Sequence, residues 1–145
     1  MWNQLVQGHV DYCSQLWQSL QSTGLQRLEN YFKIFLKKIP SLKNESYWNR
    51  LKILKINSQQ RRLERYRVIY TWKALEGQVP ECGIKSKSSE DSRLGRFCHV
   101  PTIVSKSSAR VKTLREQLFQ VHGPKLFNCL PKSIRKITGC DINKF

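Results

Sequence analysis

Apolar residues recur every three or four positions over the first twenty residues of the chain. This spacing predicts an amphipathic helix with a buried apolar stripe, because residues three or four apart share one side of a helix. The stripe consists of Trp2, Leu5, Val6, His9, Val10, Cys13, Leu16, Trp17 and Leu20. Gln and Ser fill the other side. We expect His9 and Cys13 to be buried structural residues rather than a base and its nucleophile.

A second helix is predicted after Gly24. Thr23 followed three residues later by Gln26 is typical of a capping box, and Pro40 is a helix-ending signal. The expected buried side consists of Leu25, Leu28, Phe32, Phe35, Leu36 and Ile39. The lysines of this helix, Lys33, Lys37 and Lys38, are expected to face away from it.

Two more helices are predicted before residue 77. Ser46 can cap a short helix that continues through Leu54, with Tyr47, Leu51 and Leu54 directed inward and Trp48 outward. Asn57 and Ser58 mark a break and a cap, and a longer helix then runs to about Glu76, where Gly77 provides a C-terminal stop.

The character of the sequence changes after this helix. Residues 85–92 are polar and low in complexity, and Arg93 to Val104 favour a short strand or an extended segment. A last helix is predicted from near Ser108, and Gly123-Pro124 is expected to bend or break it. The stripe of this helix consists of Val111, Leu114, Leu118 and Val121.

These patterns together predict a mainly α fold. We expect a small bundle of about four helices in residues 1–77, a polar flexible linker with a possible extended segment in 78–107, and a C-terminal helical segment in 108–145 that looks truncated.

The charge of the chain favours an anionic partner. Lys and Arg number 26 against 10 acids, giving a formal net charge of +16, yet no base occurs before Arg27. Such an excess suits RNA, DNA or an acidic membrane surface, although a basic protein that is merely soluble is an alternative. No apolar run approaches the roughly 20 residues that span a bilayer, and the N-terminus lacks the features of a signal peptide.

The sequence does not predict catalysis, a metal or a cofactor. The ten acids are scattered, no glycine-rich phosphate loop or nucleophile elbow occurs, and the cysteines lack the paired short spacing of a zinc site. The cysteines are Cys13, Cys82, Cys98, Cys129 and Cys140. Their odd number and wide spacing favour reduced thiols in an intracellular protein, in the cytoplasm or the nucleus.

Basic and aromatic residues alternate in one segment of fewer than thirty residues. Lys and Arg attract phosphate groups, Arg binds them bidentately, and an exposed Trp can stack on a base. The candidate nucleic-acid-binding residues are Trp48, Arg50, Lys52, Lys55, Arg61, Arg62, Arg65 and Lys73. The alternative is a solvated helix surface whose aromatic residues belong to the core.

Four motifs, at residues 6–17, 28–40, 47–62 and 127–131, occur in an order that resembles the C-terminal part of a reverse transcriptase of non-LTR (LINE-type, jockey-like) retrotransposons. Val6 to Trp17 is similar to the family's V-R-P-H-L-E-Y-C-S-x-V-W segment, and Leu28-Glu29 through Pro40 is similar to a leucine-rich helix that ends in basic residues. Phe127-Asn128-Cys129-Leu130-Pro131 is similar to an aromatic-Asn-x-Leu-Pro motif. A further pattern, Y-x-x-R-L-x-x-L-x-(L/I)-x-S-x-x-x-R-R, is matched by Tyr47, Arg50, Leu51, Leu54, Ile56, Ser58, Arg61 and Arg62.

The resemblance implies a non-catalytic thumb and connector region that holds template and primer through their backbones. Gln7-Gly8 replaces the family's Arg-Pro, Phe127 replaces the usual Trp, and no residue matches the polymerase aspartates of the palm. We therefore expect a fragment that binds RNA or DNA and that associates, where one is present, with the palm of a complete polymerase. The alternatives are a protein-interaction or structural remnant and a non-functional product of a decayed element. The sequence does not predict the oligomeric state.

Overall fold

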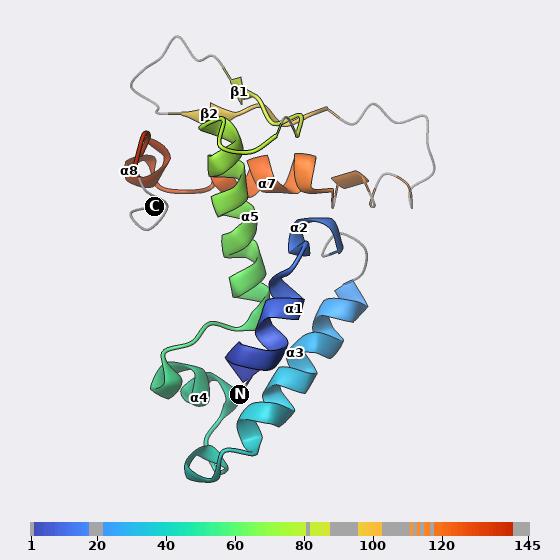
Figure 1. The fold of residues 1–145 in the computed structure, drawn as a ribbon, viewed down its shortest axis with the longest axis vertical. Helices are drawn as coiled ribbons and strands as arrows, with labels where there is room; N and C mark the ends of the chain where they lie inside the picture. Colours follow the sequence, from blue (N-terminus) through green and yellow to red (C-terminus); the bar gives the residue numbers. More distant parts are fainter. Residues whose placement is uncertain are drawn as a thin grey trace. The chain divides into compact units, whose positions relative to one another are not determined.

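The computed structural model describes residues 2–17, 22–80, 82–87, 96–102, 111, 113, 115, 116 and 118–140. In this part of the chain the protein is mainly helical, which confirms the expected fold class (Figure 1). The chain divides into two compact units, residues 1–64 and 65–145. The division falls inside helix α5 (Gln59–Leu75), and Trp72 near the end of α5 packs with Phe127 of the second unit.

The N-terminal segment is not the single amphipathic helix that the periodicity predicted. It consists of a π-helix η1 (Trp2–Val6), helix α1 (Gln7–Asp11) and helix α2 (Ser14–Trp17). Cys13 between α1 and α2 has a left-handed backbone with φ of 50°. This conformation interrupts the helical repeat, so residues before and after it no longer share one side.

The expected burial of the stripe is also wrong at several positions. Leu16 is 70% exposed, and Leu5, His9 and Cys13 are exposed as well. The buried side instead includes Gln7, whose amide forms two reciprocal hydrogen bonds with the amide of Gln59, at 3.0 and 3.1 Å. This fully paired amide couple places the polar side of the segment inward. Leu20 lies outside the described residues.

The core of the first unit forms where the sequence predicted it. Helix α3 (Ser22–Lys37) supplies Phe32 and Leu36, and helix α4 (Tyr47–Leu54) supplies Leu51. The Trp2 ring lies 5.1 Å from the rings of both Phe32 and Phe35, which holds η1 against α3 (Figure 1). A short 3-10 helix, η2 (Pro40–Leu42), follows α3.

Both predicted serine caps are present in this unit. The Ser46 hydroxyl accepts a hydrogen bond from the backbone N–H of Asn49 at the start of α4. The Ser58 hydroxyl accepts one from the N–H of Arg61 at the start of α5. Each cap satisfies an N–H that the first helical turn leaves without a backbone partner.

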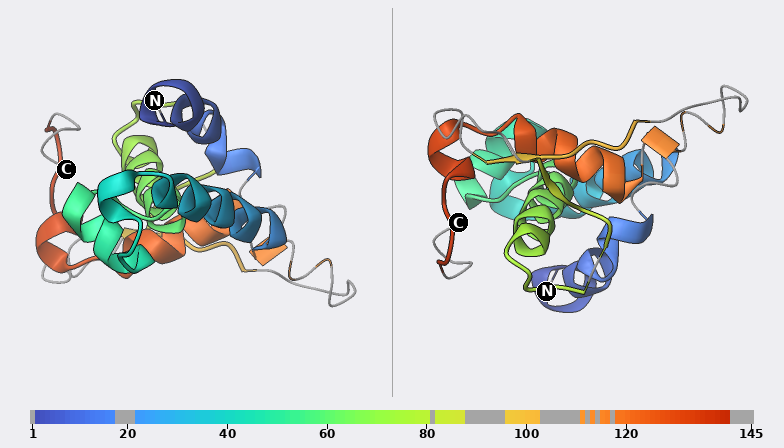
Figure 2. Two further views of the ribbon diagram at one scale, coloured as in Figure 1. Left: turned by 90° about the horizontal axis from the view of Figure 1, so that it is seen from below. Right: turned by 90° about the horizontal axis from the view of Figure 1, so that it is seen from above.

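The second unit is built around Trp72, Cys98 and Phe127. Strand β1 (Ser86–Lys87) pairs antiparallel with strand β2 (Phe97–Cys98), which lies alongside helix α7 (Phe119–Asn128), as Figures 1 and 2 show. The short helix α8 (Lys132–Arg135) follows. The expected extended segment between residues 93 and 104 thus contains β2, which contributes Cys98 to the core. Burial raises the pKa of the Cys98 thiol to about 12.

The aromatic-Asn-x-Leu-Pro motif has a structural role in this unit. Phe127 is fully buried, and the Asn128 side chain bonds to both backbone groups of Cys98. Its Oδ1 accepts from the Cys98 N–H at 2.9 Å, and its Nδ2 donates to the Cys98 carbonyl at 3.0 Å. The Asn128 amide therefore pairs with the backbone N–H and carbonyl of Cys98 in β2, as the backbone of a neighbouring strand would.

Helix α7 differs from its expected course. Gly123 and Pro124 were predicted to bend or break it, but the helix continues from Phe119 to Asn128 with both residues buried inside. The lack of a side chain at Gly123 lets α7 approach α5 closely, since a Cβ there would lie 2.7 Å from the Thr71 hydroxyl. Residues 111, 113, 115 and 116 are helical, but Val111 and Leu118 are exposed rather than buried. Leu114 and the predicted start at Ser108 lie outside the described residues.

Candidate nucleic-acid interface

Helix α4 presents one aromatic ring and two cations of the predicted site to solvent. Trp48 is 63% exposed, as expected, and Tyr47 and Leu51 occupy the inward positions, but Leu54, which was also expected to face inward, is exposed. Lys52 and Lys55 are exposed too. Lys55 is the C-cap of α4, with a left-handed backbone at φ of 53°.

Arg50 differs from its neighbours on α4 because it is buried. Only 7% of the residue is exposed, and its guanidinium donates to two backbone carbonyls. The bonds run from Nε to Leu42 at 2.9 Å and from an Nη to Lys43 at 3.1 Å. Arg50 thereby provides hydrogen-bond donors for the carbonyls of Leu42, the last residue of η2, and of Lys43, the next residue. These bonds stabilise the connection between α3 and α4. Arg50 is therefore a structural residue of this unit rather than an exposed cation.

The remaining cations of the predicted site lie on α5, and their environments differ. Arg61 in the first unit is exposed, whereas Arg62 forms an ion pair with Asp11 at 2.9 Å. In the second unit Arg65 is exposed and Lys73 is half-buried. The predicted set therefore contains four exposed cations, one ion-paired arginine, one buried arginine and one half-buried lysine.

The acids of the first unit are engaged in hydrogen bonds within that unit. Asp11 accepts from Arg62, and Glu64 accepts from the Gln60 side chain at 3.1 Å. Glu45 accepts from the Asn49 side chain at 3.2 Å. Glu29 accepts from the Tyr47 hydroxyl and, at 3.3 Å, from the backbone N–H of Gln60. Burial and the bonded carboxylate raise the pKa of the Tyr47 hydroxyl.

The exposed cations of this unit outnumber those engaged within it. In the described part of residues 1–64, one base is ion-paired and one is buried on carbonyls. The exposed ones are Arg27, Lys33, Lys37, Lys38, Lys43, Lys52, Lys55 and Arg61. The unit therefore carries a field of positive charge that its four acids do not cancel.

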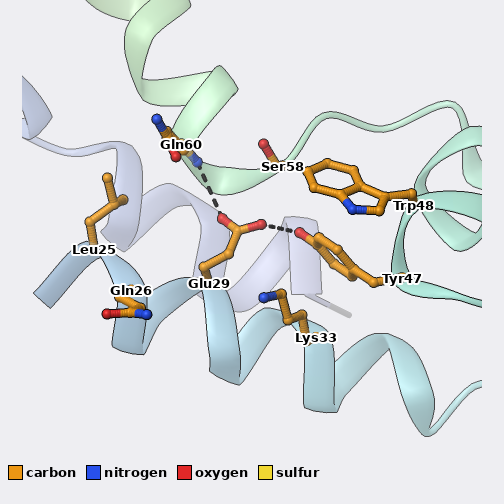
Figure 3. A pocket seen from close by; sticks show the side chains of 8 residues that line it. All are labelled: Leu25, Gln26, Glu29, Lys33, Tyr47, Trp48, Ser58 and Gln60. Carbon is orange, nitrogen blue, oxygen red and sulfur yellow. Dashed lines mark hydrogen bonds between the residues drawn. The ribbon is translucent and has the colours of Figure 1, made fainter. Parts of the chain in front are cut away.

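Two hollows in the first unit include residues that the sequence prediction did not select. One, of about 460 Å³, lies between α3, α4 and the start of α5 (Figure 3). Its lining consists of Leu25, Gln26, Glu29, Lys33, Tyr47, Trp48, Ser58 and Gln60. The other, of about 510 Å³, is lined by Ile34, Lys37, Lys38, Pro40 and Lys43. The sequence signals for the first were Trp48, which was predicted to be exposed, and the spacing of Glu29 and Lys33, four residues apart on one helix side.

The described residues contain neither a metal-binding cluster nor a membrane-spanning helix. No three His, Cys, Asp or Glu side chains among them gather closely enough to hold a metal ion. In the same part of the chain, no helix combines the length and apolarity that crossing a membrane requires. Comparisons with models of protein families, with curated proteins and with solved structures found no match to this chain.

Proposed function

We propose that the chain binds the phosphate backbone of RNA or DNA without reading its sequence, through the first unit. The observation that carries this proposal is that eight exposed cations stand against four acids, each of which is engaged in hydrogen bonds within the unit. A phosphate that approaches this unit meets Lys and Arg ends that are in solvent. Binding releases the counterions condensed on the nucleic acid, which provides most of the free energy of nonspecific association.

Exposed Trp48 supports a nucleic acid over other polyanions. An indole in water at the edge of a basic surface gives an unpaired base a stacking partner, which a sulfated sugar or an acidic peptide does not use in the same way. Lys52 lies four residues after Trp48 on α4, so the ring and a cation share one side of the helix.

The order of the four sequence motifs supports a more specific proposal for the origin of the chain. It would be a fragment of a non-LTR retrotransposon reverse transcriptase, from the region that holds template and primer behind the palm. In this proposal the fragment is not an enzyme on its own, because no residue matches the palm aspartates. Its contribution is nonspecific contact with nucleic-acid backbone, which positions a strand but carries no sequence information.

The test is a salt series of binding to single-stranded RNA, duplex DNA and an RNA–DNA hybrid. The variant Lys52→Gln/Lys55→Gln/Arg61→Gln removes three exposed cations of the first unit but keeps most of each side-chain stem. The matched control Lys125→Gln/Lys132→Gln/Lys136→Gln removes three exposed cations of the second unit. Both variants have the same net charge.

We expect salt-sensitive binding by the unmodified chain. The log–log slope should fall by about 0.9 per lost contact on duplex DNA and by about 0.7 on single strands, in the first variant only. Equal reductions in both variants would mean general basicity without a defined surface. Undetectable binding at moderate salt would overturn the proposal.

A specific observation favours a second candidate function, self-association or binding to another protein. The N-terminal segment exposes the apolar side chains of Leu5, Val6, Tyr12 and Leu16. Association with a second copy of the chain or with another protein would remove these side chains from water, which is favourable. The mass measured by size exclusion with light scattering discriminates: a monomer at high concentration argues against self-association.

A further inference from the structure

The hollow beside Trp48 combines three kinds of group that together suit a nucleotide. Figure 3 shows the Tyr47 and Trp48 rings on the α4 side, Glu29 and Lys33 on the α3 side, and Gln60 above them from α5. All of these residues belong to the first unit. The volume of about 460 Å³ lies within the range of small-ligand sites.

The aromatic side of the pocket can hold a flat ring. The Tyr47 and Trp48 rings have centroids 5.2 Å apart and an interplanar angle of 57°. They are thus not stacked face to face on each other. Trp48 is 63% exposed even though a Trp ring gains much by burial, so its stacking surface is accessible. An unpaired base is a ring that can cover it.

The opposite side of the pocket can bind the edge of such a ring. Glu29 accepts one hydrogen bond at each carboxylate oxygen, from the Tyr47 hydroxyl and from the Gln60 N–H. Those two bonds fix the carboxylate, which has about four acceptor positions in all. The remaining acceptor positions of the Glu29 carboxylate can bind only ligand groups that donate a hydrogen bond. An exocyclic amino group offers two N–H donors to these positions, whereas uracil and thymine offer only the ring N3–H, so an amino-bearing base fits better.

Lys33 supplies the charge that a phosphate needs. Its ammonium lies 5.1 Å from the centroid of the Tyr47 ring, at the edge of the same pocket. An organic cation could also contact the aromatic rings, but the positive charge of Lys33 would repel it. The combination of ring, carboxylate and cation favours a base that is linked to a phosphate over an organic cation.

We propose that this pocket binds one unpaired, amino-bearing nucleobase of a single strand, with its phosphate on Lys33 and its ring against Trp48. The proposal rests on the proposed function, since it presupposes a nucleic acid on the first unit, and it adds a base contact to the backbone contacts. It further assigns the chain a preference for single strands, because the bases of a duplex are already stacked and paired.

The test compares oligonucleotides of equal length and charge. The probes are oligo-dA, oligo-dT and a chain of abasic deoxyribose phosphates, measured at several salt concentrations. We expect oligo-dA to bind about five-fold to 150-fold more tightly than the abasic chain, the range that loss of one stacked base produces. The salt slopes of the two should be alike, because their charges are alike.

Substitutions then assign the preference to the pocket. Trp48→Ala should reduce oligo-dA binding to the level of the abasic chain without changing the salt slope, and Trp48→Phe should restore part of it. Tyr31→Ala removes an exposed aromatic residue of α3 that does not line the pocket. It should change neither the affinity for oligo-dA nor the salt slope. Glu29→Gln should reduce the preference for oligo-dA over oligo-dT, with circular dichroism verifying the fold.

The outcomes separate the two proposals. Salt-sensitive binding that is equal for oligo-dA and the abasic chain would overturn the base pocket and leave the backbone surface intact. A preference for oligo-dA that survives Trp48→Ala would also overturn the pocket. Absence of salt-sensitive binding to every probe would overturn the proposed function itself.

Discussion

Arg62 holds the carboxylate of Asp11 with two nitrogens, Nε at 3.2 Å and Nη2 at 2.9 Å from the same oxygen, Oδ2. Asp11 is the first acid in the chain and Arg62 follows it by 51 residues. The ion pair therefore connects the N-terminal segment to α5. One of the candidate nucleic-acid-binding arginines thus has a structural partner, whereas its neighbour Arg61 is exposed.

This difference predicts that two adjacent substitutions change different properties of the chain. Arg62→Gln should lower the free energy of unfolding by about 1 kcal/mol, because it breaks a partly exposed, charge-assisted pair. Arg61→Gln should change stability by less than about 0.5 kcal/mol but should flatten the salt dependence of nucleic-acid binding. Urea unfolding and a binding series on both variants provide the measurement. Equal stability of the two variants would contradict the structural role of Arg62.

Local signals predicted much of the fold of the first unit. Ser46 and Ser58 act within three residues of the N–H groups they cap, and the stripe of α3 requires only the helical repeat to place Phe32 and Leu36 inward. Trp48 was also predictable as exposed, since Tyr47 and Leu51 define the inner side of α4, although the same pattern wrongly placed Leu54 inward.

The misplaced residues depend on partners that are distant in sequence. Gln7 is buried because Gln59 pairs with its amide, and Arg50 is buried because η2 presents carbonyls to it. Neither partner is visible in a helical repeat. The pocket beside Trp48 combines three helices, so its composition could not be read from one segment.

The position of Leu16 leads to a second prediction. The sequence pattern placed it in a buried stripe, where Leu16→Asp would unfold the unit, but 70% of Leu16 is exposed. We therefore expect Leu16→Asp to change the free energy of unfolding by about 0.5 kcal/mol or less. Leu36→Asp is the matched control, because Leu36 is buried in the core and a buried unpaired charge is severely destabilising. Thermal melting followed by circular dichroism compares the two; a large loss for Leu16→Asp would refute its exposure.

Two helical glycines should respond to alanine with opposite signs. A Cβ on Gly123 in α7 would lie 2.7 Å from the Thr71 hydroxyl and 2.9 Å from the Phe119 ring. Thr71 cannot easily retreat, since it is fully buried and donates to the Arg67 carbonyl at 2.8 Å. Gly123→Ala should cost about 1–3 kcal/mol through overpacking.

Gly8 in α1 is the control for that prediction. A Cβ at this position meets no atom within 4 Å, so alanine adds helix propensity without a clash. Gly8→Ala should stabilise the chain by up to about 1 kcal/mol. Denaturant unfolding of the two variants gives the signs, and stabilisation by Gly123→Ala would contradict the close approach of α7 to Thr71.

Glu76 should make the stability of the second unit depend on pH. Its carboxylate accepts from the Gly139 backbone N–H at 2.8 Å and from the Arg96 guanidinium. These contacts, with the Gly139 bond the larger cause, lower the pKa of Glu76 below its ordinary value of 4.5. A carboxyl with a lowered folded-state pKa stabilises the fold above its unfolded value. The contribution is therefore complete at neutral pH and is lost as the pH falls below about 4.5 through the folded-state pKa.

The variant Glu76→Gln separates this contribution from that of the other acids. At pH 7 it should lower the free energy of unfolding by about 1–2 kcal/mol, because an amide cannot replace both charge-assisted bonds. The difference from the unmodified chain should shrink toward pH 3, since protonation then removes the same charge from Glu76. Denaturant unfolding of both chains at a series of pH values measures this difference in the free energy of unfolding. A difference that is constant from pH 7 to pH 3 would show that the Glu76 charge does not stabilise the second unit.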